Sequence, residues 1–311
     1  MRILMVGAGA VGGYFGGRLL EKGEDVTFFV RPRREQQLRE GGLVIRSIHG
    51  NFQTPVCTLT PGGEAEAFDL AVLAVKAYHL DRILEDVRPY IGSETMVLPL
   101  LNGLTHLDKL DEAFSPDQVL GGLCFIETTL TAQGEIEQYS DRHDLMFGER
   151  DGSVSDRIRR LEKTLNGARM NAVRSDNILM EMWKKYLFIS TFSGITSLMN
   201  SAIGPILETE YGSGITRRLL DEIAACARHR EPSLNDTLVD GVFKVVSSLA
   251  PQMKSSMLRD IEKGSPVEAD HLHGELLRMA GDREDLPLLR TVYTFLKTYE
   301  ANRLKETKAA L

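Results

Sequence analysis

The first residues that could carry chemistry form a glycine-rich run after a short apolar segment, residues 3–6. The run consists of Gly7, Ala8, Gly9, Ala10, Val11 and Gly12. This G-x-G-x-x-G spacing permits a tight turn, a close approach of the backbone to a pyrophosphate, and close packing of a helix on a strand. The first N–H groups of such a helix face the phosphates, where the helix dipole favours negative charge. With a helical pattern over 14–21 and a second strand over 25–30, the run predicts a dinucleotide site rather than a purely structural strand–turn–helix.

The residues that end the second expected strand select the nucleotide. Folds that bind NAD(H) place an Asp or Glu about 20 residues after the glycines to bond the ribose 2′-hydroxyl, whereas a nearby Arg accommodates a 2′-phosphate. This chain has Arg31-Pro32-Arg33-Arg34 at that place. The guanidinium of Arg31 can form two parallel hydrogen bonds to phosphate oxygens, so we expect NADP(H). Arg33 and Arg34 are interpreted as a solvated basic start to the next helix.

Two polar residues follow the next apolar segments. Lys76 comes after residues 70–75, and Asn102 comes after residues 95–101. Ligands bind an open α/β sheet at the carboxyl ends of its strands, so both side chains could reach a cofactor or an oxyanion. The alternative is a lysine at a helix start and an Asn-Gly turn. We favour a role in binding.

A lysine in the second half of the chain lies within an unusually apolar helical segment, residues 182–194. Lys185, Ile189 and Ser193 are spaced i, i+4 and i+8, so they share one face of the helix. A buried ammonium costs free energy unless it finds a partner, and residues 255–268 supply hydroxyls and a carboxylate. The residues alone leave two interpretations open: a lysine–carboxylate site, or a lysine whose stem packs while its head reaches water.

Two kinds of supporting structure must position these residues. Before the change in pattern, the expected elements are helices at 34–40, 80–87 and 156–165, a β-rich stretch at 43–60, and short strands within 121–148. Continuous apolar strands separated by helices indicate a parallel sheet covered on both faces. Beyond about residue 177 helical periodicity dominates. The sequence therefore predicts an α/β N-terminal Rossmann-type dinucleotide-binding domain (1–170) and an all-α C-terminal domain (171–311), with the boundary near 168–176.

Global properties restrict the class of protein. The 311 residues carry a net charge of −7, which argues against nucleic acid or an anionic membrane as a partner. Cys57, Cys124 and Cys226 form no disulfide framework and are expected to be small buried residues, as in a reducing compartment. No segment resembles a signal peptide or a membrane span, so we expect a cytoplasmic protein. Helical domains of this size pack as dimers or stand alone, which leaves a homodimer open.

Taken together, these motifs resemble the ketopantoate reductase family (2-dehydropantoate 2-reductase) over essentially the whole chain. The matching pieces are the glycine run, Arg31, Val75-Lys76, Asn102-Gly103, Trp183-Lys184-Lys185, residues 255–260 and residues 268–270. The resemblance implies NADPH-dependent reduction of 2-dehydropantoate to (R)-pantoate, a step toward pantothenate and coenzyme A.

The resemblance also implies roles for individual residues. Lys185 matches the catalytic lysine of the family, and Glu268 matches the acidic residue that supports the site. Ser256 matches a substrate-binding serine. Lys76 and Asn102 match residues near the nicotinamide and the substrate, and Ser193 lies at a substrate-side position.

Several substrate-side positions depart from the family pattern. Ile189 and Ser193 stand where many members have asparagines, Leu101 replaces a glutamine, and His273 replaces an asparagine. Two alternatives therefore remain: a reductase of a more apolar 2-oxo acid, and a non-catalytic NADP(H)-binding sensor. Retention of Lys185 and Glu268 argues against the sensor.

A metal site is the least favoured interpretation of the sequence. Asp270, His271 and His273 are close together, but no further ligand set lies near them. We therefore interpret them as one face of a helix and expect no metal.

Overall fold

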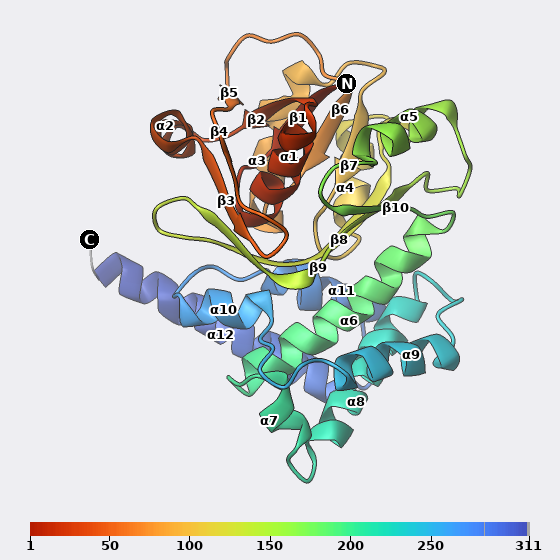
Figure 1. The fold of residues 1–311 in the computed structure, drawn as a ribbon. Coiled ribbons are helices and arrows are strands. Elements are labelled where there is room, and N and C mark those ends of the chain that lie inside the picture. Colours follow the sequence, from red (N-terminus) through yellow and green to blue (C-terminus); the bar gives the residue numbers. More distant parts are fainter. Residues whose placement is uncertain (283, 310–311) are drawn as a thin grey trace. The chain divides into compact units, whose positions relative to one another are not determined.

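The computed structural model describes residues 1–282 and 284–309, which fall into two compact units, Met1–Met182 and Trp183–Leu311 (Figure 1). The first unit is built on parallel sheet and helices, and the second is helical. The expected fold class, an α/β Rossmann-type domain followed by an all-α domain, is confirmed. No helix among the described residues is both long and apolar enough to cross a membrane.

The first sheet of the N-terminal unit is parallel throughout and has the strand order β5-β2-β1-β6-β7. Its strands are β1 (Arg2–Val6), β2 (Asp25–Phe29), β5 (Cys57–Leu59), β6 (Leu70–Leu73) and β7 (Met96–Pro99). All residues of β6 and β7 are buried, as expected for strands covered on both faces. Cys57 is exposed, contrary to expectation, because β5 is an edge strand; Cys124 and Cys226 are buried.

Five α-helices accompany the strands of this unit: α1 (Ala10–Lys22), α2 (Pro32–Gly41), α3 (Leu80–Val87), α4 (His106–Ala113) and α5 (Asp156–Leu165). Helices α3 and α5 have the predicted bounds, since their apolar residues repeat at helical spacing. Helix α1 begins earlier than the predicted residue 14, because the glycine run itself forms its first turn. It ends at Gly23, which adopts φ +101° and caps the helix through its N–H.

A second sheet has the order β10-β9-β3-β4, and β8 pairs with β9. Its strands are β3 (Leu43–Ser47), β4 (Phe52–Thr54), β8 (Gly121–Leu130), β9 (Ile136–Gly148) and β10 (Asn171–Arg174). The prediction of short strands within 121–148 was wrong. Strands β8 and β9 are 10 and 13 residues long and antiparallel, because the polar residues in this stretch lie along the strands and do not mark turns.

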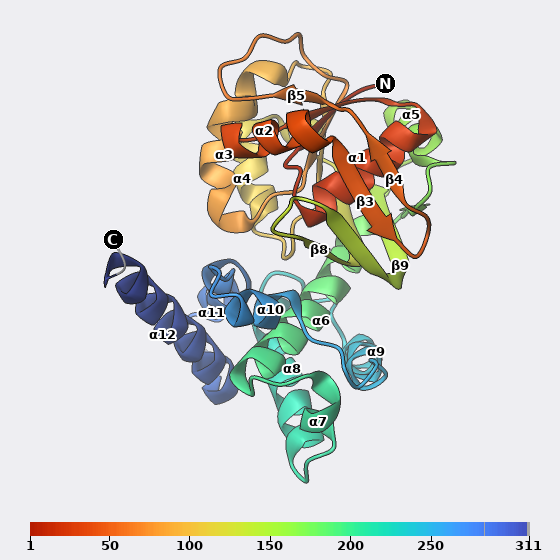
Figure 2. The same ribbon diagram turned by 60° about the vertical axis from the view of Figure 1, so that its left-hand side comes forward.

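Helix α1 packs between the two sheets, and glycines make this possible (Figure 2). A Cβ on Gly13 or Gly17 would collide with side chains of the second sheet, Ile136 and Ile45 respectively. A Cβ on Gly16 would lie 2.7 Å from the ring of Phe28 in the first sheet. These glycines therefore allow α1, the helix that follows the glycine loop, to pack closely against both sheets.

The C-terminal unit consists of helices around the apolar helix α6 (Ile178–Leu198), which starts at the end of the first unit. The other elements are α7 (Ile203–Leu207), α8 (Gly212–Arg228), α9 (Asp236–Ser247), α10 (Ser256–Glu262), the π-helical turn η4 (Asp270–Gly274), α11 (Glu275–Ala280) and α12 (Pro287–Ala309). Almost every residue of α6 from 185 to 197 is buried. A helix that is buried all round forms the centre of a domain. The backbone of Lys185 therefore lies in the core of the C-terminal unit.

Candidate functional site

The fold requires a glycine at Gly7 and at Gly12 of the G-x-G-x-x-G run, but not at Gly9. Gly7 follows β1 with φ +99°, and a Cβ there would lie 2.8 Å from the carbonyl oxygen of Ala74. A Cβ on Gly12 would collide with the carbonyl of Gly7, so the turn and the helix could not close on each other. A Cβ on Gly9, in contrast, would have no heavy atom of the described residues within 4 Å. Gly9 thus faces open space, where a ligand can approach the backbone.

The space at Gly9 lies at the N-terminus of a 13-residue helix. Gly9 is the N-cap of α1, and its carbonyl accepts the bond from Gly13 N at 2.9 Å. The first turn of α1 has no acidic residue. Its N–H groups and the positive end of the helix dipole are therefore available to an anion. A dinucleotide pyrophosphate fits this loop.

The next strand places an arginine beside this loop. Arg31 is exposed, is the N-cap of α2, and lies two residues after β2, which pairs with β1.

His79, in the short turn η1 (Ala77–His79), was not singled out from the sequence. Burial and, to a lesser degree, the charges of Arg31 and Arg82 lower the pKa of His79. A histidine three residues after Lys76 is the only signal that could have indicated it.

Lys76 and Asn102 lie at the same edge of the sheet as the glycine loop. Strand partners Val6, Leu73 and Pro99 lie side by side in β1, β6 and β7. Gly9, Lys76 and Asn102 each come three residues after one of these partners, and both polar side chains are partly exposed. The predicted nucleotide-side residues therefore gather at the carboxyl ends of three neighbouring strands.

In the C-terminal unit, Lys185 and Glu268 are both buried, with 7% and 9% of their surface exposed. Lys185 lies on α6, and Glu268 lies just before η4, where its carbonyl accepts a bond from Leu272 N at 3.0 Å. Burying an ammonium and a carboxylate in one small unit is costly unless they serve each other or a ligand.

Tyr186 and His273 join the helix of the lysine to the turn that follows the glutamate. Tyr186 donates its hydroxyl to the carbonyl of Leu272 at 2.6 Å. His273 Nε2 lies 2.9 Å from the carbonyl oxygen of Ser190 and donates to it. Burial raises the pKa of Tyr186 well above its usual value and lowers that of His273 to about 4. Both groups are therefore neutral near pH 7 and hold α6 against η4. Single π-helical turns of this kind are frequent at functional sites.

The predicted substrate-side hydroxyls have different surroundings. Ser256 is the exposed first residue of α10. Its neighbour Ser255 is buried, caps α10 by accepting from Leu258 N, and accepts a bond from Thr196 Oγ1 of α6 at 2.8 Å. Ser193 is buried and donates its hydroxyl to the carbonyl of Ile189 at 2.6 Å. Ser256 is therefore accessible to a ligand, whereas the proton of Ser193 is used within its own helix.

The Asp270–His273 segment does not have the surroundings of a metal site. Asp270 accepts bonds from Tyr293 and Lys297, at 2.6 and 2.8 Å, and these bonds lower its pKa. These residues lie in the helical turn η4, as expected, where Asp270 is exposed and His273 is fully buried. Among the residues that the structure describes, no three His, Cys, Asp or Glu side chains are placed to hold a metal ion.

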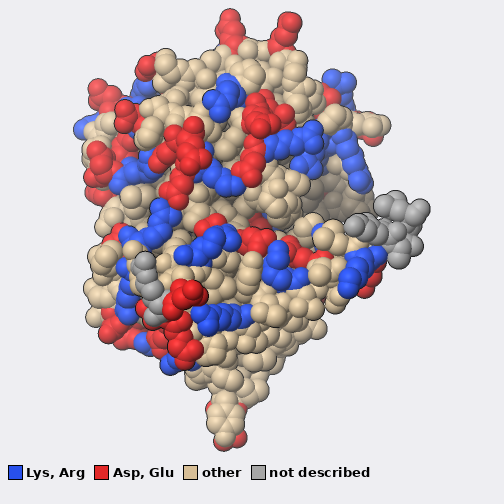
Figure 3. Space-filling model, turned by 180° about the vertical axis from the view of Figure 1, so that it is seen from behind, with Lys and Arg blue, Asp and Glu red and all other residues tan. Residues whose placement is uncertain are grey.

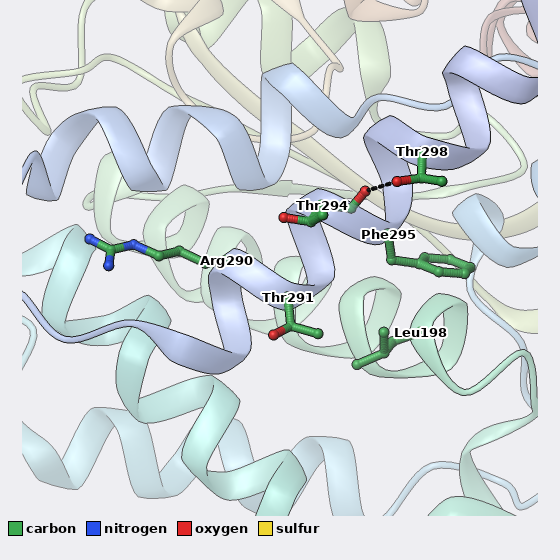
Figure 4. A pocket seen from close by; sticks show the side chains of 6 residues that line it. All are labelled: Leu198, Arg290, Thr291, Thr294, Phe295 and Thr298. Carbon is green, nitrogen blue, oxygen red and sulfur yellow. Dashed lines mark hydrogen bonds between the residues drawn. The ribbon is translucent and has the colours of Figure 1, made fainter.

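A depression between the end of α6 and α12 offers little chemistry (Figure 4). It is lined by Leu198, Arg290, Thr291, Thr294, Phe295 and Thr298. The hydroxyls of Thr291 and Thr298 donate to carbonyls of their own helix, and the second of these bonds is drawn in Figure 4. Because a substrate site needs convergent polar groups, this depression is a weaker candidate than the surroundings of Lys185.

Acidic and basic side chains are interspersed over the face drawn in Figure 3. This pattern agrees with the moderate net charge of −7. The absence of a nucleic-acid partner stays a prediction.

Comparison with known proteins yields consistent matches along the chain. Residues 3–152 match the family model described as ketopantoate reductase PanE/ApbA, and residues 177–300 match the model of its C-terminal part. The chain is 46% identical to the uncharacterized oxidoreductase YkpB of Bacillus subtilis, over 97% of this chain and 100% of that protein. It is 27% identical to a 2-dehydropantoate 2-reductase of Mesorhizobium japonicum, over 88% and 89% of the two chains.

Solved structures share the fold. A 2-dehydropantoate 2-reductase of Geobacter metallireducens matches with a TM-score of 0.87 and 26% identity, covering 96% of this chain and 99% of that one. A D-mandelate dehydrogenase in a ternary structure with NADH and anilino(oxo)acetate matches with a TM-score of 0.86 and 21% identity, over 97% and 99% of the two chains. At that identity the second likeness concerns the fold alone.

Proposed function

The chain belongs to the ketopantoate reductase family, an oxidoreductase family, and from that premise we propose that it reduces a 2-oxo acid to the 2-hydroxy acid with NADPH. The first candidate substrate is 2-dehydropantoate, whose reduction to (R)-pantoate leads toward pantothenate and coenzyme A. The observation that carries the proposal is the buried lysine of α6, Lys185, in the unit that also buries Glu268.

The nucleotide half of the proposal uses residues of the N-terminal unit. The backbone around Gly9 would hold the pyrophosphate, and Arg31 would bind the 2′-phosphate. Lys76 and Asn102 lie at the strand ends where the nicotinamide and the substrate carboxylate are expected. When bound, NADPH supplies the hydride that adds to the carbonyl carbon.

The chemical half of the proposal rests on the C-terminal unit. As hydride reaches the carbonyl carbon, negative charge develops on the carbonyl oxygen. The ammonium of Lys185 would stabilise that charge and donate the proton that completes the hydroxyl group. Glu268 would supply an opposite charge to the buried ammonium of Lys185 and help to hold it at the site. Ser256 would contribute a hydroxyl to the substrate.

A second candidate substrate is a 2-oxo acid with an apolar side chain. Ile189 lies one helical turn after Lys185, and the hydroxyl of Ser193 is bonded to the carbonyl of Ile189. His273 is buried and bonded to Ser190. These three positions therefore present few hydrogen-bonding groups to a substrate hydroxyl.

A matched substrate pair tests the proposal. 2-Dehydropantoate and 3,3-dimethyl-2-oxobutanoate have the same carbon skeleton and differ by one hydroxyl group. We expect NADPH oxidation with at least one of them. A larger kcat/KM for 2-dehydropantoate would support the first candidate substrate. A larger kcat/KM for 3,3-dimethyl-2-oxobutanoate would support the second candidate, a 2-oxo acid with an apolar side chain. Tight NADPH binding without oxidation by these or other 2-oxo acids would contradict the proposal and favour a non-catalytic sensor.

A further inference from the structure

Arg34 has surroundings that the sequence did not indicate. Its Nε donates to the carbonyl of Ala8 in the glycine loop at 3.0 Å, and its Nη1 donates to the carbonyl of Gly134 at 3.0 Å. Nη1 also donates to Gln37 Oε1 at 3.2 Å. The side chain is half-buried, and burial lowers its pKa. The expectation that Arg34 is a solvated residue was wrong, whereas Arg33 is exposed.

The bond to Ala8 constrains the peptide unit that joins Ala8 to Gly9. No described peptide bond is cis, and in a trans peptide the C=O and the N–H point to opposite sides. When the carbonyl of Ala8 points at Arg34, the N–H of Gly9 therefore points away from it. Gly9 also has open space at its Cβ position, unlike Gly7 and Gly12 of the same loop.

The turn between β8 and β9 contacts Nη1 of Arg34 through Gly134. Gly134 adopts φ +85°, and a Cβ there would collide with Nη1 of Arg34. Gly134 N donates to the carbonyl of Thr131, and Glu135 N donates to Thr131 Oγ1. The guanidinium thus bridges this closed turn and the glycine loop.

We propose that Arg34 is a positioning residue that orients the Ala8–Gly9 peptide of the glycine loop for the pyrophosphate of the nucleotide. The proposal rests on the proposed function for the identity of the ligand. NADPH and NADH share the pyrophosphate, so Arg34 acts equally on both. Arg31, which is assigned to the 2′-phosphate, acts on NADPH alone.

Nucleotide titrations of Arg34→Met separate these roles, with Arg33→Met as the matched control for a lost positive charge. Dissociation constants for NADPH and NADH are measured by nucleotide fluorescence without substrate. We expect both constants to rise about tenfold in Arg34→Met, the size of one hydrogen bond to a charged group, with an unchanged ratio. Gly134→Ala, which alters no charge, should act in the same direction. The proposal would be overturned if Arg34→Met weakened the binding of NADPH but not of NADH. It would also be overturned if the dissociation constants of Arg34→Met equalled those of Arg33→Met.

A second measurement needs no nucleotide. Hydrogen–deuterium exchange of a peptide spanning residues 7–13 should be several-fold faster in Arg34→Met than in Arg33→Met, because the loop loses its anchor. Equal exchange in the two variants would contradict the positioning role. If the unmodified chain bound neither nucleotide, the proposed function would fail, and this exchange experiment would still decide whether Arg34 positions the loop.

Discussion

At the scale of single residues, the proposed function gives Gly9 and Arg31 two different nucleotide contacts, to the pyrophosphate and to the 2′-phosphate. Arg31 is exposed at the start of α2, so its guanidinium is available to a phosphate at little structural cost. Gly9 has φ −78°, a value that any residue adopts, and its open side is therefore not explained by backbone conformation. The open side of Gly9 is what a ligand that approaches the backbone requires.

We predict that Arg31→Ala loses the preference for NADPH. A hydrogen bond to a charged group contributes about 1.5–3 kcal/mol, so the dissociation constant of NADPH should rise roughly tenfold or more while that of NADH stays the same. Arg39→Ala, which removes an exposed arginine near the other end of α2, is the control. Equal affinity of the unmodified protein for NADPH and NADH would show that Arg31 does not select the nucleotide.

Gly9→Val should abolish NADPH binding and leave the fold intact. The backbone angles of Gly9 suit valine, and a Cβ there has no heavy atom of the described residues within 4 Å, so we expect the new side chain to obstruct the approaching nucleotide. Gly7→Val is the contrasting variant, because φ +99° and the nearby carbonyl of Ala74 make any side chain costly there. Thermal unfolding should thus be nearly unchanged in the first variant and shifted to lower temperature in the second. Normal NADPH binding by Gly9→Val would mean that the loop is only structural.

At the scale of elements, the packing of η4 against α6 makes stability depend on pH. His273 has a pKa of about 4 in the folded chain, because burial disfavours its charged form, and about 6.5 when unfolded. Between these values the unfolded chain binds more protons, so the free energy of unfolding falls as pH decreases through this window. The loss amounts to about 2 kcal/mol between pH 7 and pH 5.

Denaturant unfolding at pH 7 and pH 5 measures this loss. His273→Asn should be less stable at pH 7, because the bond to Ser190 and much of the packing are lost, but its stability should change less with pH. The same pH dependence in His273→Asn and the unmodified chain would show that other groups control acid stability.

Local patterns predicted much of the fold and the form of the glycine loop proposed for the nucleotide. The bounds of α3 and α5 follow from apolar residues at helical spacing, and the glycine loop from residues within one turn of each other. The role of Arg34 could not be predicted, because its partners Ala8 and Gly134 lie 26 and 100 residues away. The burial of His273 was missed for the same reason: its environment is provided by α6, which lies 83 residues earlier at Ser190.

At the scale of the whole molecule, the two units divide the proposed reaction. The N-terminal unit carries the glycine loop, Arg31, Lys76 and Asn102, and the C-terminal unit carries Lys185 and Glu268. Substitutions of these residues in the N-terminal unit should therefore alter the affinity for the nucleotide, and substitutions of Lys185 or Glu268 in the C-terminal unit should alter kcat. This separation is what a kinetic experiment can measure.

The most direct test of the central claim is the turnover of Lys185→Ala on the best substrate of the matched pair. Loss of a general acid lowers kcat by roughly 10²–10⁴-fold, and we predict a fall in this range with little change in the affinity for NADPH. Lys184→Ala, which removes the adjacent and more exposed lysine, should keep most of its activity. Near-normal kcat in Lys185→Ala would mean that the lysine only packs in α6, and would contradict the proposed mechanism.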